Sequence, residues 1–200
     1  MATMVSNADK TFKVTVGNTK GVSSSQAAGV SYGYAQVEPN HLSAQRTGAI
    51  YAQLPCKSDI EVLENGQFVK YDYPEGVVDF TGKGEWMLVF NEVKLYDGIR
   101  ETYKDFALKK TDYIDGVMTP RVFKTNIGDI FTTNTIKTAA TTNTGKTVGE
   151  ELTVGDLLKV DATGFLADGG DVSTDAMVWE VVKETTLPDG QPAVKIMRIK

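Results

Sequence analysis

The sequence of 200 residues contains one cysteine and one histidine. A single cysteine cannot form an internal disulfide, so the fold does not depend on oxidising surroundings, and we expect Cys56 to be buried and inert. Because His41 is the single histidine, the chain has few ligands for a transition metal, and a nucleophile–histidine–acid triad would depend on this one residue. We therefore expect a solvated His41, no metal, no cofactor and no catalytic residues.

Long apolar runs and basic excess are also missing. No stretch approaches the roughly 18 apolar residues of a membrane-spanning helix, and residues 1–10 lack the basic start and apolar run of a signal peptide. We expect a soluble protein, made in a reducing cytoplasm, that engages no membrane. The net charge of −5 argues against a nucleic-acid-binding surface.

The charge is unevenly distributed. Residues 1–50 hold four basic and two acidic residues, a sum of +2, so the remaining 17 basic and 24 acidic residues sum to −7. A mildly basic arm lying along an acidic neighbour would explain this difference, and so would chance in a short segment. Both interpretations stay open.

A turn followed at once by an apolar strand recurs along the chain. It occurs at residues 64–71, 127–131 and 154–160. Each copy places a glycine where the backbone turns with positive φ, and each then continues into β-forming residues. This pattern predicts an all-β fold, a single small barrel or sandwich.

The chain divides into an N-terminal arm, residues 1–48, and a β body, residues 49–200. The arm is extended and rich in Gly, Ser and Ala, and residues 17–34 cannot bury enough apolar area to order alone. The alternating run Phe12–Val16 could add a strand to its own sheet or to a partner's. The arm is either a disordered tail or a segment that orders against neighbouring subunits. The candidate contacts are Phe12, Val14, Val16, Tyr32 and Tyr34, with Val37 as a further anchor.

Within the body, Asn65-Gly66 predicts a hairpin between residues 60–63 and 68–73, followed by a turn at 74–76. The apolar run Trp86–Phe90 predicts a strand buried on both faces. Residues 97–120 are harder to assign, because Ile99, Tyr103 and Phe106 have helical spacing. We predict a short helix or an irregular loop there.

The C-terminal part predicts short strands at residues 157–160 and 164–166, then a hairpin between 176–184 and 193–199. Val194, Ile196 and residues of one parity around Trp179 should face the core. Between the two regions, the Thr/Asn-rich stretch 132–147 should begin as a strand and end as an exposed loop.

Several motifs were weighed as reactive sites. Gly145-Lys146-Thr147 resembles the end of a phosphate-binding loop, but Ala140 stands where that loop needs another glycine. The acidic loop 168–175 lacks the ligand spacing of a calcium loop, so we expect a solvated turn. Carboxylate pairs on predicted loops lack an apolar pocket that would separate their pKa values. These pairs are Glu150 with Glu151, and Asp112 with Asp115.

Aromatic side chains offer a different function. Stacked aromatics form sugar-binding platforms in carbohydrate-binding sandwiches, but Trp86 and Phe90 lie in the most apolar strand and are better explained as core. The remaining members of the set are Tyr71, Tyr73 and Trp179.

The body, residues 50–200, resembles the capsid decoration or cement proteins of tailed bacteriophages. The residues that carry this resemblance are the turn-and-strand phrases 65–69, 127–132 and 154–161. It implies a non-enzymatic virion structural protein, made in the host cytoplasm, that binds the major capsid protein on the capsid surface as a homo-oligomer. Two alternatives remain: a carbohydrate- or receptor-binding β-module, such as a head-fibre or adhesin domain, and an enzyme with an unfamiliar site.

Overall fold

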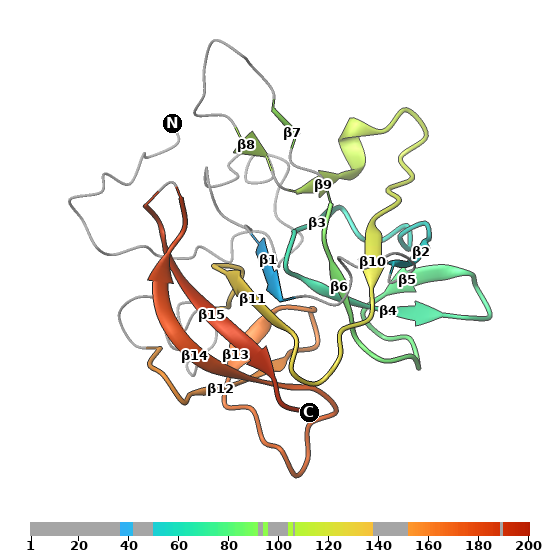
Figure 1. Cartoon of the computed structure of the whole chain (residues 1–200). Helices are drawn as coiled ribbons and strands as arrows, with labels where there is room; N and C mark the ends of the chain where they lie inside the picture. The colour runs from blue at the N-terminus through green and yellow to red at the C-terminus, as the bar shows by residue number, and fades with distance from the viewer. Residues whose placement is uncertain are drawn as a thin grey trace.

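The computed structural model describes residues 37–41, 50–91, 94–95, 104–105, 107–137, 152–188 and 190–200. Within these ranges the chain is all-β, and its sheets curl like half of a barrel (Figure 1). The helical element among the described residues is one 3-10 turn at Lys110–Asp112. The predicted fold class is confirmed.

The larger sheet has six strands in the order β1-β11-β15-β14-β12-β13. All of its strand pairs are antiparallel. The bounds are β1 Val37–His41, β11 Ile130–Thr133, β12 Leu157–Val160, β13 Leu166–Asp168, β14 Val178–Thr186 and β15 Pro192–Arg198.

The second sheet has five strands in the order β2-β10-β6-β4-β5. Its bounds are β2 Ile50–Gln53, β4 Phe68–Asp72, β5 Val77–Asp79, β6 Met87–Val89 and β10 Arg121–Phe123. Two short ladders complete the described strands: β3 (Val62–Leu63) with β9 (Leu108–Lys109), and β7 (Lys94–Leu95) with β8 (Lys104–Asp105).

The five-stranded sheet is buried on both faces. Leu88 of β6 belongs to the core packed between the two sheets, whereas Met87 and Val89 belong to a second core on the opposite face. Successive strand residues point to opposite faces, so a continuous apolar run fits a strand covered on both sides. The prediction for residues 86–90 is confirmed.

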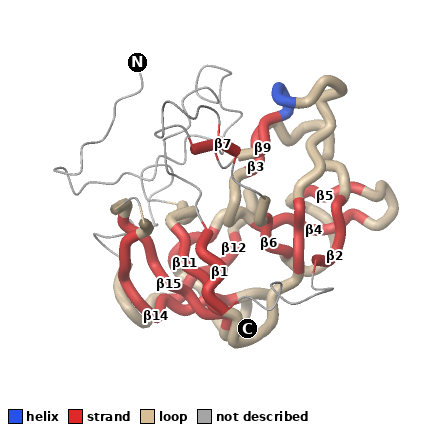
Figure 2. The backbone as a smooth tube through the Cα atoms, turned by 45° about the horizontal axis from the view of Figure 1, so that its top comes forward, coloured by secondary structure: helices blue, strands red, loops and turns tan. Residues whose placement is uncertain are grey.

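The first core joins the two sheets into a sandwich (Figure 2). Phe68 and Phe131, one from each sheet, both contact Trp179, with ring centroids 5.8 and 5.0 Å away. Val194 and Ile196 are fully buried in the same core, as the alternation of β15 predicts. The second core lies between the five-stranded sheet and the ladder of β3 with β9.

The first two strands pair with strands from the middle of the chain, one in each sheet. β1 is antiparallel to β11 in the six-stranded sheet, and β2 is antiparallel to β10 in the five-stranded sheet. Residues 37–41 fall within the predicted arm, and here they form an edge strand of the six-stranded sheet.

The predicted hairpin around Asn65-Gly66 is wrong, although its turn is present. β3 pairs with β9, and β4 pairs with β5 and β6. Gly66 has a φ of +82°, but its N–H donates to Val89 of β6, so the turn carries the chain from one ladder to another. A strand buried on both faces takes its neighbours from distant sequence, and this pairing overrides the local hairpin signal.

The following turn, between β4 and β5, forms as predicted, with a hydrogen bond from Gly76 N–H to Asp72 O.

The helix or irregular loop predicted within 97–120 is confirmed only in part, because Lys110–Asp112 is a short 3-10 helix and residues 113–120 are an irregular loop. Lys104–Asp105 and Leu108–Lys109 are strands that pair with β7 and β3. Long-range pairing again outweighs local spacing. Ile99, Tyr103 and Phe106 lie outside the described residues.

The C-terminal hairpin and the strand at 157–160 form as predicted, whereas the strand predicted at 164–166 begins two residues later, as Leu166–Asp168. β12 pairs with β13, and β14 pairs with β15 across residues 187–191. The front of the Thr/Asn-rich stretch is strand β11, and Thr132, Thr133, Asn134 and Thr135 are buried, which the sequence analysis missed. The predicted exposed loop that follows lies mostly outside the described residues.

Candidate functional site

The predicted contact residues of the arm lie outside the described part of the chain. These are Phe12, Val14, Val16, Tyr32 and Tyr34. Val37, the further anchor, is described: it is partly buried and packs against the first core. Its side chain therefore contributes to this protein's own sandwich.

The histidine, the phosphate-loop-like motif and the carboxylate pairs form no catalytic arrangement in the described part of the chain. His41 ends β1, opposite Ile130, while residues 145–147 and the pair Glu150 with Glu151 lie outside the described ranges. Asp112 and Asp115 are both exposed. Asp115 Oδ1 accepts a hydrogen bond from Val117 N at 3.1 Å, so this carboxylate stabilises a turn.

The acidic loop between β13 and β14 is an exposed turn, as predicted. Asp171 Oδ1 accepts hydrogen bonds from Ser173 Oγ at 2.6 Å and Ser173 N at 2.7 Å, and these bonds lower the pKa of Asp171. Asp175 accepts from the N–H of Asp171. In the described ranges, no three His, Cys, Asp or Glu side chains gather as a metal site would require.

The recurring phrase of the sequence forms the same turn three times. In the turns 64–67, 126–129 and 153–156, the fourth residue donates its N–H to the first residue's carbonyl. The fourth side chain, Gln67, Asp129 or Asp156, accepts from the first residue's N–H at 2.7–2.9 Å. The third residue is a glycine with a φ of +82° to +95°. A β-turn of this kind, closed at both ends, holds its tip in one conformation.

In each turn, the third and fourth residues face a single residue of a neighbouring strand, which is the geometry of a β-bulge. One residue of that strand accepts from the glycine N–H and donates to the carbonyl of the turn's fourth residue, with all distances 2.8–2.9 Å. The three residues that do this are Val89, Arg198 and Val181. Such a bulge fixes the turn against the sheet.

Two of these turns present an apolar side chain to solvent. Ile127 is 72% exposed and Val154 is 61% exposed, both at the second position of the turn. The corresponding Asn65 is buried and hydrogen-bonded to Asn91. The second residue of this turn is therefore buried in one copy and exposed in the other two.

A further turn, at 113–116, carries Ile114, the most exposed large apolar residue in the described part of the chain, with Val117 beside it. Its base is fixed on both sides. Lys110 Nζ donates to Ser58 O at 2.7 Å and to Glu61 Oε1 at 3.1 Å, and the buried Met118 accepts from Cys56 N. The loop thus displays an apolar tip on an ordered base.

Two pairs of the exposed apolar residues lie at different ends of the molecule. Gly128 N donates to Arg198 O, and Lys200 Nζ donates to Val172 O, so Ile127 and Val172 lie beside the end of β15. Figures 1 and 2 both place the chain's C-terminus at the end opposite the loop that follows the 3-10 turn. We call Ile114 with Val117 the upper tip, and Ile127 with Val172 the lower rim.

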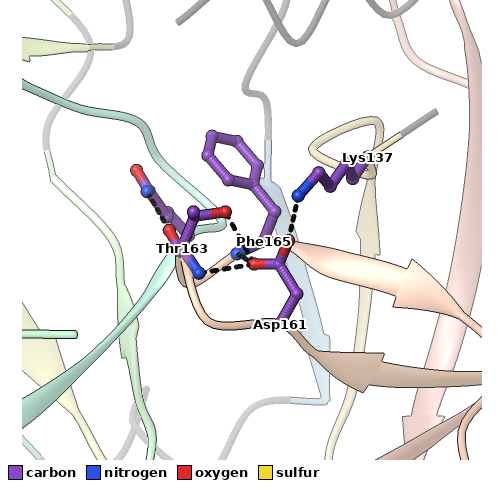
Figure 3. Close-up of polar contacts among 5 residues, drawn as sticks. Lys137, Asp161, Thr163 and Phe165 are labelled. Carbon is purple, nitrogen blue, oxygen red and sulfur yellow. Dashed lines mark hydrogen bonds and ion pairs between the residues drawn. The ribbon is translucent and has the colours of Figure 1, made fainter. Parts of the chain in front are cut away.

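A cluster of charged and polar contacts lies where the sheets meet (Figure 3). Lys137 Nζ lies 2.5 Å from Asp161 Oδ2, and Asp161 Oδ1 accepts from Thr163 N, Thr163 Oγ1 and Phe165 N at 2.7–3.1 Å. Gln67 Nε2 donates to Thr163 O at 2.7 Å, linking this turn to the start of β4. The contacts of Asp161 brace the turn between β12 and β13, and the bond from Gln67 to Thr163 joins that turn to the other sheet.

The aromatic set divides between core and surface. Trp179 and Trp86 are buried, and Phe90 packs against the first core, as predicted. Tyr71 and Tyr73 form an edge-to-face pair with centroids 4.2 Å apart, and Tyr73 is 59% exposed.

The sequence patterns did not predict the upper tip or the lower rim. A signal was available at three of these residues, because Ile114, Val117 and Ile127 stand within two residues of a turn glycine. An apolar side chain at such a position lies at a turn tip, where the core cannot reach it.

No protein-family model matches this chain, and no curated protein or solved structure does. Among the described helical residues, none forms a helix long and apolar enough to cross a membrane.

Proposed function

We propose that this chain is a non-enzymatic virion structural protein that binds and stabilises an assembled phage capsid lattice. It acts as a decoration or cement subunit, contacting the major capsid protein on the capsid surface as a homo-oligomer. The observation that supports this is the placement of exposed apolar turn residues at two opposite ends of a braced β-sandwich.

A cement subunit must hold two neighbours at once. A rigid body with a contact site at each end meets this need, because binding at one end raises the effective concentration of the other end near its own partner. Burying one isoleucine side chain contributes about 1.5–3 kcal/mol. Binding only to the assembled lattice stabilises that lattice by mass action.

The braced turns favour this function because they lower the entropic cost of docking. The upper tip is held by Lys110 and Met118, and the turn of Ile127 is closed by Asp129. Preordered contact residues lose less conformational freedom when they bind. The arm would add contacts that order on docking.

The experiment measures cosedimentation of the chain with purified, expanded phage heads that lack it. Substituting both upper-tip residues with serine, or both lower-rim residues, should weaken binding more than about tenfold. Val154→Ser is the matched control, since it removes an exposed apolar turn residue beside the middle of β14. Equal binding by all three variants would contradict the proposal.

The second candidate is a carbohydrate- or receptor-binding module. The exposed Tyr73, paired edge to face with the partly buried Tyr71, favours it, because a tyrosine ring can stack on a sugar ring. A glycan array separates the two functions: a glycan signal abolished by Tyr73→Ala would support the module, and a blank array agrees with the cement subunit.

A further inference from the structure

Unpaired strand edges are templates for another strand unless the protein blocks them. The two larger sheets present four terminal strands, β1 and β13 in one sheet and β2 and β5 in the other. A fifth stretch of edge is the end of β14, beyond its pairing with β12.

Two of these edges are closed by the chain itself. At β13, Lys137 N donates to Leu166 O at 2.7 Å. At β5, Val78 donates to Pro55 O at 2.9 Å and accepts from Lys57 N at 3.0 Å. Neither strand offers a free row of backbone groups to a partner.

Two further edges carry features that oppose pairing. β1 contains Pro39, which has no N–H, at an irregularity between Glu38 and His41. The end of β14 carries the exposed charges of Lys183 and Glu184. Proline, bulges and charge are the means by which sheets protect their edges.

β2 lacks most of these protections. Residues 49–54 include neither proline nor charge. β2 has one irregularity between Ile50 and Ala52, after which Ala52 and Gln53 keep regular pairing with β10. Among the described residues, no strand pairs with its outer side.

We propose that the outer edge of β2 accepts the segment Phe12–Val16 of a second copy of this chain as an added β-strand. That segment alternates β-forming and polar residues without proline. It belongs to residues 1–50, whose net charge is +2, and the body that would receive it carries −7. This proposal rests on the proposed oligomeric cement function and names the contact that links its subunits.

The direction of the chain leaves the arm free to reach a second copy. β1 runs from Val37, opposite Thr133, to His41, opposite Ile130, and the chain then continues to β2. The arm therefore joins β1 at the end farthest from the same chain's β2. The 20 residues between Val16 and Val37 span up to about 66 Å when extended, which reaches a neighbouring copy.

Disulfide trapping between full-length chains tests this. A Val14→Cys variant is mixed with a Gln53→Cys variant under mild oxidation, and mass spectrometry identifies the joined peptides. Cys56 stays out of the exchange, because burial raises its pKa to about 12. The matched control pairs Val14→Cys with Glu184→Cys, an exposed position on a charged edge.

We expect the 14–53 disulfide to exceed the 14–184 disulfide by at least about tenfold, since a docked strand raises the local concentration of its thiol. Adding Thr15→Pro to the Val14→Cys chain should abolish it, whereas Thr15→Val should preserve it. Equal yields for the two pairs, or a predominant 53–53 disulfide, would overturn the proposal. So would a double variant, Val14→Cys with Gln53→Cys, that closes only within one chain. A chain that still binds phage heads after such a result would retain the cement function and lose the strand addition.

Discussion

Gly164 occupies a position where any side chain would collide with the main chain. It has a φ of +81°, and an added Cβ would overlap the carbonyl oxygen of Phe68, whose N–H donates to Gly164 O at 2.6 Å. Backbone cannot move aside without breaking the junction between the two sheets.

Gly164→Ala should therefore destabilise the protein strongly. The matched control is Gly169→Ala, because Gly169 has a φ of +84° with open space around its Cβ position. The control should cost about 1–2 kcal/mol of unfolding free energy, and Gly164→Ala should cost at least about 2 kcal/mol more. Urea unfolding measures both, and equal losses would show that the close approach to Phe68 is absent.

Asp79 provides a pH-dependent contribution to stability. Burial alone would raise its pKa, but hydrogen bonds from Thr81 Oγ1 and from the N–H groups of Gly82 and Thr81 outweigh burial and lower it. A carboxylate with a lowered pKa stabilises the fold above its unfolded pKa, near 3.8. That contribution disappears as the pH falls through the folded value.

Asp79→Asn should cost about 1.5–3 kcal/mol at pH 7, because hydrogen bonds to a charged acceptor are lost. The difference from the natural protein should shrink as the pH falls below 3.8. Urea titrations across pH 2–7 measure both curves. A difference that stays constant with pH would mean that the Asp79 charge does not contribute.

Cys56 should be chemically silent in the folded protein. Burial raises the pKa of its thiol to about 12, so almost no reactive thiolate exists at pH 8. We expect negligible labelling by iodoacetamide in buffer and complete labelling in concentrated urea, followed by intact mass. Rapid labelling of the folded chain would place Cys56 at the surface and contradict its burial.

At the scale of elements, the three braced turns depend on the side chain at their fourth position. Asp156 Oδ2 accepts from the N–H of Thr153 at 2.7 Å and from its hydroxyl at 3.2 Å. Asp156→Ala should lower the unfolding free energy by about 1 kcal/mol, whereas Asp156→Asn retains an acceptor oxygen and should lose less. Chemical denaturation compares the two, and an alanine variant as stable as the asparagine variant would exclude this bond as a stabilising contact.

Local signals were sufficient for the elements whose cause is local. The positive φ of Gly66, Gly128 and Gly155 follows from what glycine alone tolerates, and the alternation of β15 placed Val194 and Ile196 in the core. Pairing between distant strands has no such local cause. The hairpin signal at Asn65 is satisfied by a turn, while β4 takes its neighbours from β5 and β6.

The same limit explains why the candidate site was hard to predict. A sequence pattern predicts that an apolar residue such as Ile114 is buried in the core. Ile114 is exposed because it lies at the tip of a braced turn. That the upper tip and the lower rim lie at opposite ends depends on how the two sheets stack, which no local pattern contains.

At the scale of the whole molecule, the boundary between arm and body can be set by truncation. Both cores are built from residues at or after Val37 in the described chain. Removing residues 1–36 should leave the urea midpoint nearly unchanged. Removing residues 1–48 also deletes β1, which pairs with β11 and covers part of the first core through Val37.

The longer truncation should therefore lower the unfolding free energy by about 2 kcal/mol or more, since it exposes buried apolar surface and breaks a strand pairing. Urea unfolding of both truncations beside the full chain is the measurement. Two equally stable truncations would place the boundary after β1. An unstable 1–36 deletion would mean that the arm belongs to the protein's own fold, and then its contacts would be unavailable to a neighbouring subunit or a capsid.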